Sequence, residues 1–214
     1  RMILDLQRQD GASVDPAMNR LSSITPAEYV ERYRDRMPSK IARQTFVNRF
    51  GMLRGLDDGN ANPKGIYKIR SRAEHHIYEN RRVHEFATHL VRSRRNKSIE
   101  PLVAAGELMY ASHWSHSQRC GIGGVETDRI VNLIRTHGSE AGLFGAKVTA
   151  GGAGGELVVL MRNDDRARAA LAEAVAEAET ASGQAVHVFE GSLPGAEAFE
   201  APTLKGLVDS ASAV

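Results

Sequence analysis

The chain has 214 residues, 42% hydrophobic and 25% charged, the balance of a soluble globular protein with one large domain or two small ones. Its net charge of only +2 gives no electrostatic case for nucleic acid or a membrane surface as the main partner. A single cysteine excludes an internal disulfide and favours a reducing, cytoplasmic setting, and no apolar run is long enough to span a membrane.

Residues 1–63 are polar and weakly periodic, and they predict a helical or irregular extension with a thin core. Pro26 directly after Thr25 predicts the start of a helix, because proline is favoured in the first turn. This helix should end before Pro38. A second short helix is expected over residues 41–50, followed by a loop rich in glycine and asparagine.

The middle of the chain predicts one strand and three helices. The strand is expected over residues 65–71. A helix follows, because its apolar residues recur with a 3.6-residue period at Val83, Phe86, Ala87, Leu90 and Val91. Pro101 opens the next helix, and the third begins near Glu126 and ends at Gly138.

The C-terminal part changes from a helical to an extended pattern. Strands are expected over residues 145–150, 156–161 and 185–189. Between the last two, Asn163 or Asp164 caps a helix that Gly183 closes.

This order of elements predicts an α+β fold. We expect a ferredoxin-like domain over residues 64–190, with a four-stranded antiparallel sheet and helices on one face. The helical extension, residues 1–63, precedes this domain, and an irregular tail, residues 191–214, follows it.

Glycine is unevenly distributed, since ten of the 20 glycines lie between Gly121 and Gly155. The densest group is Gly151, Gly152, Gly154 and Gly155. Such a loop lets the backbone approach a ligand closely, and successive N–H groups can form an anion-binding nest suited to phosphate. The alternative is a flexible hairpin loop. A Walker A loop is excluded, because no Lys-Ser or Lys-Thr pair follows at the required spacing.

A second group of polar residues follows Ser112. His113, His116 and Cys120 have a spacing that could hold zinc, but no fourth ligand is evident nearby. A helix end rich in hydroxyl and imidazole groups could instead face a polar ligand, or satisfy loose backbone groups. No feature of the sequence indicates a reactive thiol at Cys120.

A third group, residues 67–83, combines aromatic, basic, acidic and imidazole side chains. Tyr67 could present a flat face and a hydroxyl to a sugar. Arg72 and Glu79 could equally form a buried ion pair that locks the strand to the helix, and this structural role is favoured.

Together these segments resemble the galactokinase branch of the GHMP small-molecule kinases. GAKVTAGGAGGELVVLM, residues 145–161, is similar to the third conserved motif of that superfamily. SHWSHSQRCGIGGVETDRIV, residues 112–131, is similar to the serine-histidine helix and the Asp-containing helix after it. RSRAEHHIYENRRV, residues 70–83, resembles another segment of the same branch.

The resemblance implies a kinase that uses ATP and Mg²⁺ to phosphorylate the anomeric hydroxyl of a monosaccharide, L-arabinose or galactose. In the family an N-terminal domain supplies the main phosphate loop, the catalytic Asp and most sugar contacts, and nothing in this sequence matches that domain. We therefore expect the C-terminal portion of such a kinase, as the absence of an initiator Met also indicates, with no catalytic residue and no activity of its own. The alternative is a non-catalytic galactokinase-like sensor of sugar or nucleotide.

Functional residues carry over where the motifs match. The resemblance implies a loop on the phosphate side formed by Thr149, Gly151, Gly152, Gly154 and Gly155. It implies a sugar contact for Tyr67 and supporting roles for His113 and Asp128, and it implies no metal ligand. Ala150 and Ala153 depart from the glycine and serine that are common in relatives, and Ala150 would disfavour a positive φ.

Overall fold

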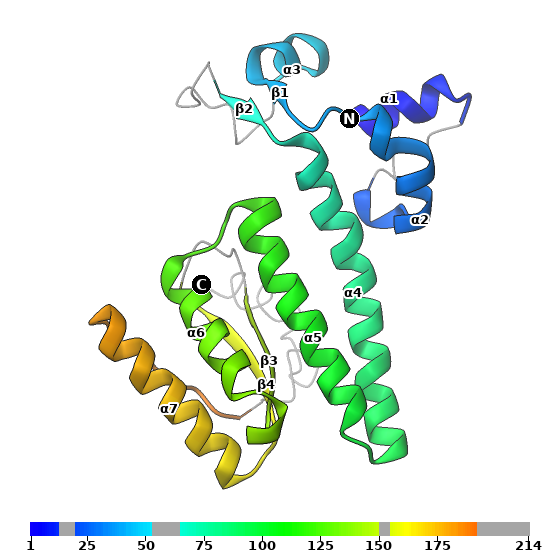
Figure 1. Cartoon of the computed structure of the whole chain (residues 1–214). Helices are drawn as coiled ribbons and strands as arrows, with labels where there is room; N and C mark the ends of the chain where they lie inside the picture. Colours follow the sequence, from blue (N-terminus) through cyan, green and yellow to red (C-terminus); the bar gives the residue numbers. More distant parts are fainter. Residues whose placement is uncertain (13–19, 53–64, 150–154, 192–214) are drawn as a thin grey trace, which may run out of the picture. The chain divides into compact units, whose positions relative to one another are not determined.

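The structure is a computed structural model that describes residues 1–12, 20–52, 65–149 and 155–191 (Figure 1). The chain divides into two compact units, residues 1–183 and 184–214. All the helices and strands described below belong to the first unit. In the second, residues 184–191 are described, and they form neither helix nor strand.

The elements follow one another along the chain as short N-terminal helices, a long helical pair and a C-terminal α/β part. They are α1 (Met2–Gln9), the 3₁₀ turn η2 (Leu21–Ser23), α2 (Pro26–Glu28), the π-helical turn η3 (Tyr29–Tyr33), the 3₁₀ turn η4 (Arg34–Arg36), β1 (Ile41–Ala42), α3 (Arg43–Phe50), β2 (Ile66–Tyr67), α4 (Ile69–Asn96), α5 (Glu100–Ser115), the π-helical turn η5 (His116–Cys120), α6 (Val125–His137), the 3₁₀ turn η6 (Ser139–Ala141), β3 (Leu143–Val148), β4 (Leu157–Met161) and α7 (Asp165–Ser182). None of the helices in the described ranges combines the length and apolar character needed to cross a bilayer.

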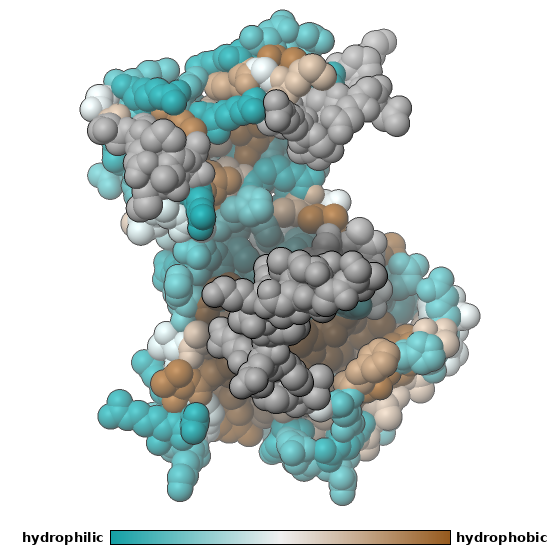
Figure 2. All heavy atoms as spheres, turned by 180° about the vertical axis from the view of Figure 1, so that it is seen from behind, coloured by the Kyte–Doolittle hydropathy of each residue, from teal (hydrophilic) through white to brown (hydrophobic). Residues whose placement is uncertain are grey.

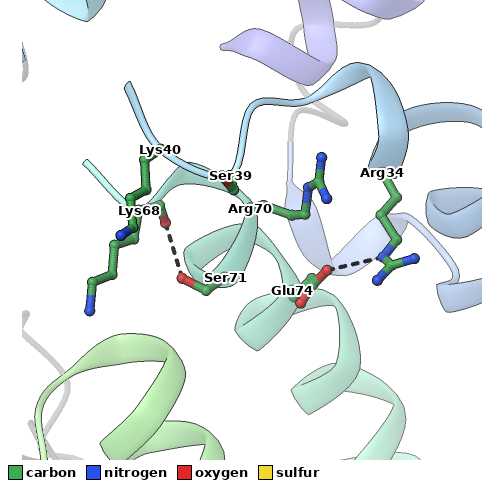
Figure 3. Close-up of a pocket in the computed structure, with 7 residues that line it drawn as sticks. All are labelled: Arg34, Ser39, Lys40, Lys68, Arg70, Ser71 and Glu74. Carbon is green, nitrogen blue, oxygen red and sulfur yellow. Dashed lines mark hydrogen bonds and ion pairs between the residues drawn. The ribbon is translucent and has the colours of Figure 1, made fainter. Parts of the chain in front are cut away.

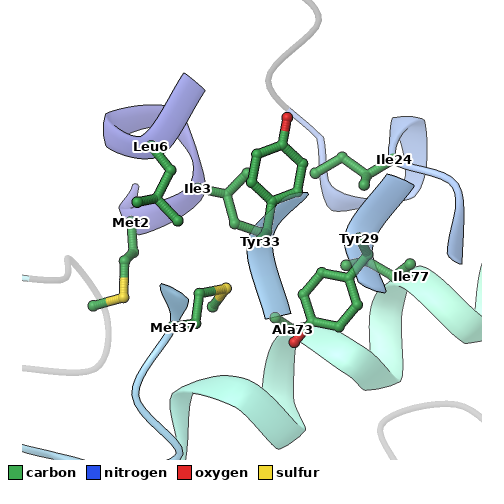
Figure 4. Packing of buried hydrophobic residues seen from close by; sticks show 9 residues of the cluster. All are labelled: Met2, Ile3, Leu6, Ile24, Tyr29, Tyr33, Met37, Ala73 and Ile77. Atoms are coloured by element: carbon green, nitrogen blue, oxygen red, sulfur yellow. The ribbon is translucent and has the colours of Figure 1, made fainter. Parts of the chain in front are cut away.

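The N-terminal elements pack on the first half of α4. Thr25 Oγ1 accepts the backbone N–H of Glu28 at 3.1 Å, so the helix start predicted at Pro26 is confirmed. Tyr29 and Tyr33 are fully buried and lie between α1 and α4 (Figure 4). The N-terminal cluster that they form consists of Met2, Ile3, Leu6, Ile24, Tyr29, Tyr33, Met37, Ala73 and Ile77.

The second cluster surrounds a hairpin of β3 and β4, which pair antiparallel with Ala146 opposite Val159. Helices α5 and α6 pack against β3, and α7 packs against α6 (Figure 1). Every residue of β4 is apolar, but Leu157, Val159 and Met161 pack against the cluster while Val158 is exposed, because successive side chains of a strand point to opposite faces. The hairpin cluster consists of Tyr110, Val131, Ile134, Leu143, Ala146, Ala167, Ala170, Leu171 and Ala174.

Helix α5 touches the backbone of β3 directly, at a point where both elements have glycine. A Cβ placed on Gly106 would overlap the carbonyl of Phe144, and one placed on Gly145 would meet the backbone of Gly106. Two glycines are therefore required for this helix to approach the strand so closely.

The α+β class is confirmed, but the described residues form two separate two-stranded sheets instead of the predicted four-stranded sheet. Residues 65–71 do not form one strand, because only Ile66 and Tyr67 are extended, paired with β1, and α4 begins at Ile69. Residues 185–189 form no strand in the structure. Phe189, the last residue of this predicted strand, is 92% exposed.

The predicted helix ends agree with the structure. Asp164 caps α7 by accepting the N–H of Ala167 at 2.8 Å. Gly138 and Gly183 end α6 and α7 with φ of +69° and +68°, the conformation that favours glycine.

The apolar stripe predicted along α4 is only partly covered. Phe86 and Leu90 are half-buried, whereas Val83 and Val91 are 57% and 68% exposed. Val158 on β4 is also exposed. Seen from behind, apolar atoms gather in the lower half of the view, the half that contains the β3–β4 hairpin (Figure 2).

Candidate functional site

His113, on the buried side of α5, fixes the end of β3. The backbone N–H of Val148 donates to His113 Nδ1 at 3.2 Å, and His113 Nε2 lies 3.0 Å from Asp128 Oδ1 on α6. Because Nδ1 accepts a hydrogen bond, the proton of the neutral ring is on Nε2, the nitrogen that faces the Asp128 carboxylate. The Ser117 hydroxyl also donates to Asp128, at 2.9 Å. The His113 imidazole thus joins its own helix, α5, to β3 and α6. Its contact on β3 is Val148, the residue before Thr149.

Burial determines the charge of this imidazole. It lowers the pKa of His113 below its ordinary value, and the neighbouring Asp128 carboxylate only partly opposes the effect. The ring is therefore neutral at physiological pH, as the hydrogen bond from Val148 requires.

Glu79 fixes the residue before Val148 on β3, which is Lys147. Glu79 on α4 accepts hydrogen bonds from Lys147 Nζ at 3.2 Å, from Arg82 at 2.7 Å and from the Ser112 hydroxyl. Burial alone would raise the pKa of Glu79, but Ser112, Lys147 and Arg82 outweigh it and hold the pKa below its ordinary value. The ionised carboxylate therefore ties the end of β3 to α4.

A third buried group lies next to Glu79 on the same helix. His75 Nδ1 is 3.0 Å from the hydroxyl of Ser115, which is fully buried. The rings of His76 and His116 lie 5.2 and 4.7 Å away, both nearly perpendicular to His75. Burial, aided by His116, lowers the pKa of His75 to about 4, so this ring is also neutral at pH 7.

The predicted ion pair between Arg72 and Glu79 is wrong. Glu79 pairs with Arg82 and Lys147 instead, because these cations face it from its own helix and from β3. Arg72 lies against Gly121, which ends η5 with φ of +64°.

The residues with zinc-like spacing do not converge. His113 faces β3, His116 packs on His75, and burial raises the pKa of the Cys120 thiol, which makes it a poor nucleophile. Within the described parts of the chain, no three His, Cys, Asp or Glu side chains are grouped to hold a metal ion.

The predicted phosphate-side loop begins and ends within the described residues. The backbone N–H of Thr149 donates to the carbonyl of Glu156 at 3.1 Å. This hydrogen bond joins the two strands at the point where the loop leaves and re-enters the hairpin. Gly155 has φ of +101°, which a residue with a side chain rarely adopts. Gly151, Gly152 and Gly154 lie outside the described residues, as do Ala150 and Ala153.

Of the other predicted residues, the structure brings His113 and Asp128 together but places Tyr67 elsewhere. Tyr67 belongs to the β1–β2 sheet, where its ring packs edge-on against Phe46 with 5.4 Å between centroids. It lies with the N-terminal elements and not in the His113–Asp128 contact.

Two residues that the sequence did not single out are central to the site, Lys147 and Ser115, and Glu79 was predicted with the wrong partner. A signal was available for Glu79, because His75, Glu79 and Arg82 have i, i+4 and i, i+3 spacings and share one face of α4. No local pattern could assign Lys147, since its partner is 68 residues away.

Comparison with known proteins defines the class. The crystal structure of Lactococcus lactis galactokinase in complex with galactose superimposes with a TM-score of 0.54 at 20% identity, over 86% of this chain and 37% of that one. Galactokinase of Mycobacterium tuberculosis is 40% identical over 97 residues, 45% of this chain and 23% of that protein. Over the matched residues the chain is therefore similar to galactokinases, as its motifs indicated.

A particular relative is L-arabinokinase of Arabidopsis thaliana. It is 33% identical over 198 residues, which make up 89% of this chain and 18% of that protein. No family profile matches the sequence. The chain thus spans about a fifth to just over a third of the length of these relatives.

Proposed function

We propose that this chain is the C-terminal portion of an ATP-dependent sugar 1-kinase that phosphorylates the anomeric hydroxyl of L-arabinose or galactose. The observation that carries the proposal is that two side chains, His113 and Glu79, both fix the end of β3. His113 binds the N–H of Val148 and Glu79 binds Lys147, so the two residues before the glycine-rich loop are fixed to three helices. The similarity to L-arabinokinase and to the galactokinases supplies the reaction class.

Phosphoryl transfer needs positioning and compensation of negative charge more than covalent chemistry from the protein. ATP supplies the phosphoryl group when it is bound. In this proposal the loop from Thr149 to Gly155 contributes backbone N–H donors on the phosphate side, and the buried hydrogen bonds below it keep these donors in place. His113 and Asp128 are therefore positioning residues, acting through the backbone of Val148.

The donors that this chain offers fit a phosphate group better than a metal ion. Thr149 is exposed at the start of the loop, while Glu79 and Asp128 are both engaged by neighbouring side chains. The proposal therefore assigns the Mg²⁺ ligands and the catalytic base to an N-terminal domain in the longer protein. Tyr67 is then a sugar contact where that domain meets the residues of this chain. Residues 1–63 would then connect that domain to a C-terminal domain of residues 64–190, with residues 191–214 as a tail.

Gly152→Val in the longer protein tests this proposal. We expect the turnover number to fall about 100-fold with little change in the KM for the sugar, because a displaced loop affects transfer more than sugar binding. Gly183→Ala is the control, since this glycine ends α7 in open space. Turnover near the wild-type value in Gly152→Val would exclude the loop from the reaction.

Two further measurements separate the enzyme from the sensor. The 214-residue chain alone should not phosphorylate either sugar, and saturable turnover by it would contradict the assignment of the base to another domain. If the longer protein binds L-arabinose or galactose but never transfers phosphate, a sensor replaces the kinase.

A further inference from the structure

A basic hollow lies at the start of α4, where η4 and the segment before β1 meet it (Figure 3). It has a volume of about 260 Å³. Four cationic side chains line it, from three different stretches of the chain: Arg34, Lys40, Lys68 and Arg70. We propose that this hollow binds the phosphate group of a small phosphorylated molecule.

The positive charge of the hollow is poorly compensated. Its one carboxylate, Glu74, lies 3.5 Å from Arg34 and also accepts a hydrogen bond from Arg119, so two guanidinium groups share it. Arg70 donates twice to the carbonyl oxygen of Met37, at 3.2 and 2.6 Å, and a carbonyl leaves its charge in place. The ammonium groups of Lys40 and Lys68 make no hydrogen bond or ion pair with other described residues.

The two arginines have partners that position them, while the ammonium groups of the two lysines have none among the described residues. Arg34 pairs with Glu74 and Arg70 donates to Met37, so their guanidinium groups lose less side-chain entropy on binding than unpaired ones would. The side chains of Lys40 and Lys68 lie beside each other in Figure 3, and their flexible stems let the ammonium groups close on a bound anion. Ser39 adds a hydroxyl donor on the same rim.

The size and setting of the hollow favour a compact anion. The hollow is small, which favours one phosphate group over the extended backbone of a nucleic acid. Guanidinium and ammonium groups together suit the three terminal oxygens of a phosphate monoester. The volume admits a phosphate with a small organic group attached. This inference does not depend on the proposed kinase function.

Calorimetric titration of the 214-residue chain tests the proposal, with inorganic phosphate and with glycerol 3-phosphate as probes and glycerol as the neutral control. We expect saturable binding at one site for both phosphates. The double variant Lys40→Ala/Lys68→Ala should weaken it at least about tenfold, because two charge-assisted contacts are lost. The control Arg94→Ala/Arg95→Ala removes the same charge from the exposed end of α4 and should change the affinity less than about twofold.

The outcomes are distinct. Tighter binding of glycerol 3-phosphate than of inorganic phosphate indicates a ligand with an organic part, and equal binding indicates phosphate itself; both support the site. Absence of saturable binding, or equal weakening in the two double variants, overturns it. Unfolding midpoints check that the variants fold. If the double variant does not fold, Lys68→Met alone replaces it, with an expected weakening of about threefold.

Discussion

The N-terminal cluster and the hairpin cluster differ in where their polar groups lie. Around the N-terminal cluster the polar contacts are at the surface, as in the pairing of Arg36 with Asp10 at 2.8 Å. Beside the hairpin cluster, Ser112, His113 and Ser115 are themselves buried and bonded to β3, α4 and α6. The first region is held mainly by apolar burial, with only part-buried hydrogen bonds at the Tyr33 hydroxyl, whereas the second also depends on hydrogen bonds between buried groups.

This difference predicts different sensitivities. Apolar burial does not change with pH and tolerates small changes in shape. Buried polar groups require a set protonation state and a fixed geometry, and leaving one without its partner costs free energy. The end of β3, where the glycine-rich loop begins, lies in the sensitive region.

The largest effect is expected where α5 touches β3. Gly106→Val should lower the free energy of unfolding by about 4 kcal/mol or more, because a side chain there overlaps the carbonyl of Phe144. Urea unfolding followed by circular dichroism measures this. Gly183→Ala, at a glycine with open space around it, should cost only about 1 kcal/mol. Equal losses in the two variants would show that the close approach is not as described.

The next effect is a loss of stability in acid that arises beside the hairpin cluster. The pKa of His75 is about 4 in the folded chain and 6.5 ordinarily, so below pH 6.5 the unfolded chain binds a proton that the folded chain does not. The free energy of unfolding should therefore fall as the pH drops from 6.5 to 4, by on the order of 3 kcal/mol from this group. Burial also lowers the pKa of His113 and His116, which acts in the same direction.

His75→Gln should flatten this pH dependence, because Gln does not titrate and can still bond to Ser115. Denaturant unfolding at a series of pH values between 7.5 and 4 measures the slope. His84→Gln, at an exposed position of the same helix, is the control and should leave the slope unchanged. An unchanged slope in His75→Gln would remove His75 as its source.

The smallest effect separates buried from exposed ion pairs. Glu79→Gln should cost about 2 kcal/mol, because it leaves Lys147 and Arg82 facing a neutral amide in a largely buried place. Glu107→Gln removes the pair with Arg135, which is 3.1 Å long but more than half exposed on both sides, and should cost about 0.5 kcal/mol or less. Thermal unfolding distinguishes the two, and similar costs would show that the Glu79 network is a surface feature.

Local signals gave several helix ends correctly, although α1 was not predicted and the first turn of α4 was predicted as part of a strand. Thr25, Asp164, Gly138 and Gly183 act through contacts within a few residues, so their roles could be read from neighbours in the sequence. The strands were less predictable, because a strand is stable only when a partner and a buried face exist. Residues 66–67 paired with residues 41–42, a distant segment that no local pattern identifies.

The sequence by itself indicated the galactokinase-like relatives and the α+β content, and it predicted supporting roles for His113 and Asp128, because motifs and helical periodicity are properties of neighbouring residues. Only the tertiary structure decided that His113 holds the backbone of Val148 and that Glu79 holds Lys147. The physical reason is that both contacts join elements at least 35 residues apart, and their energy depends on burial that the packed helices and hairpin create together.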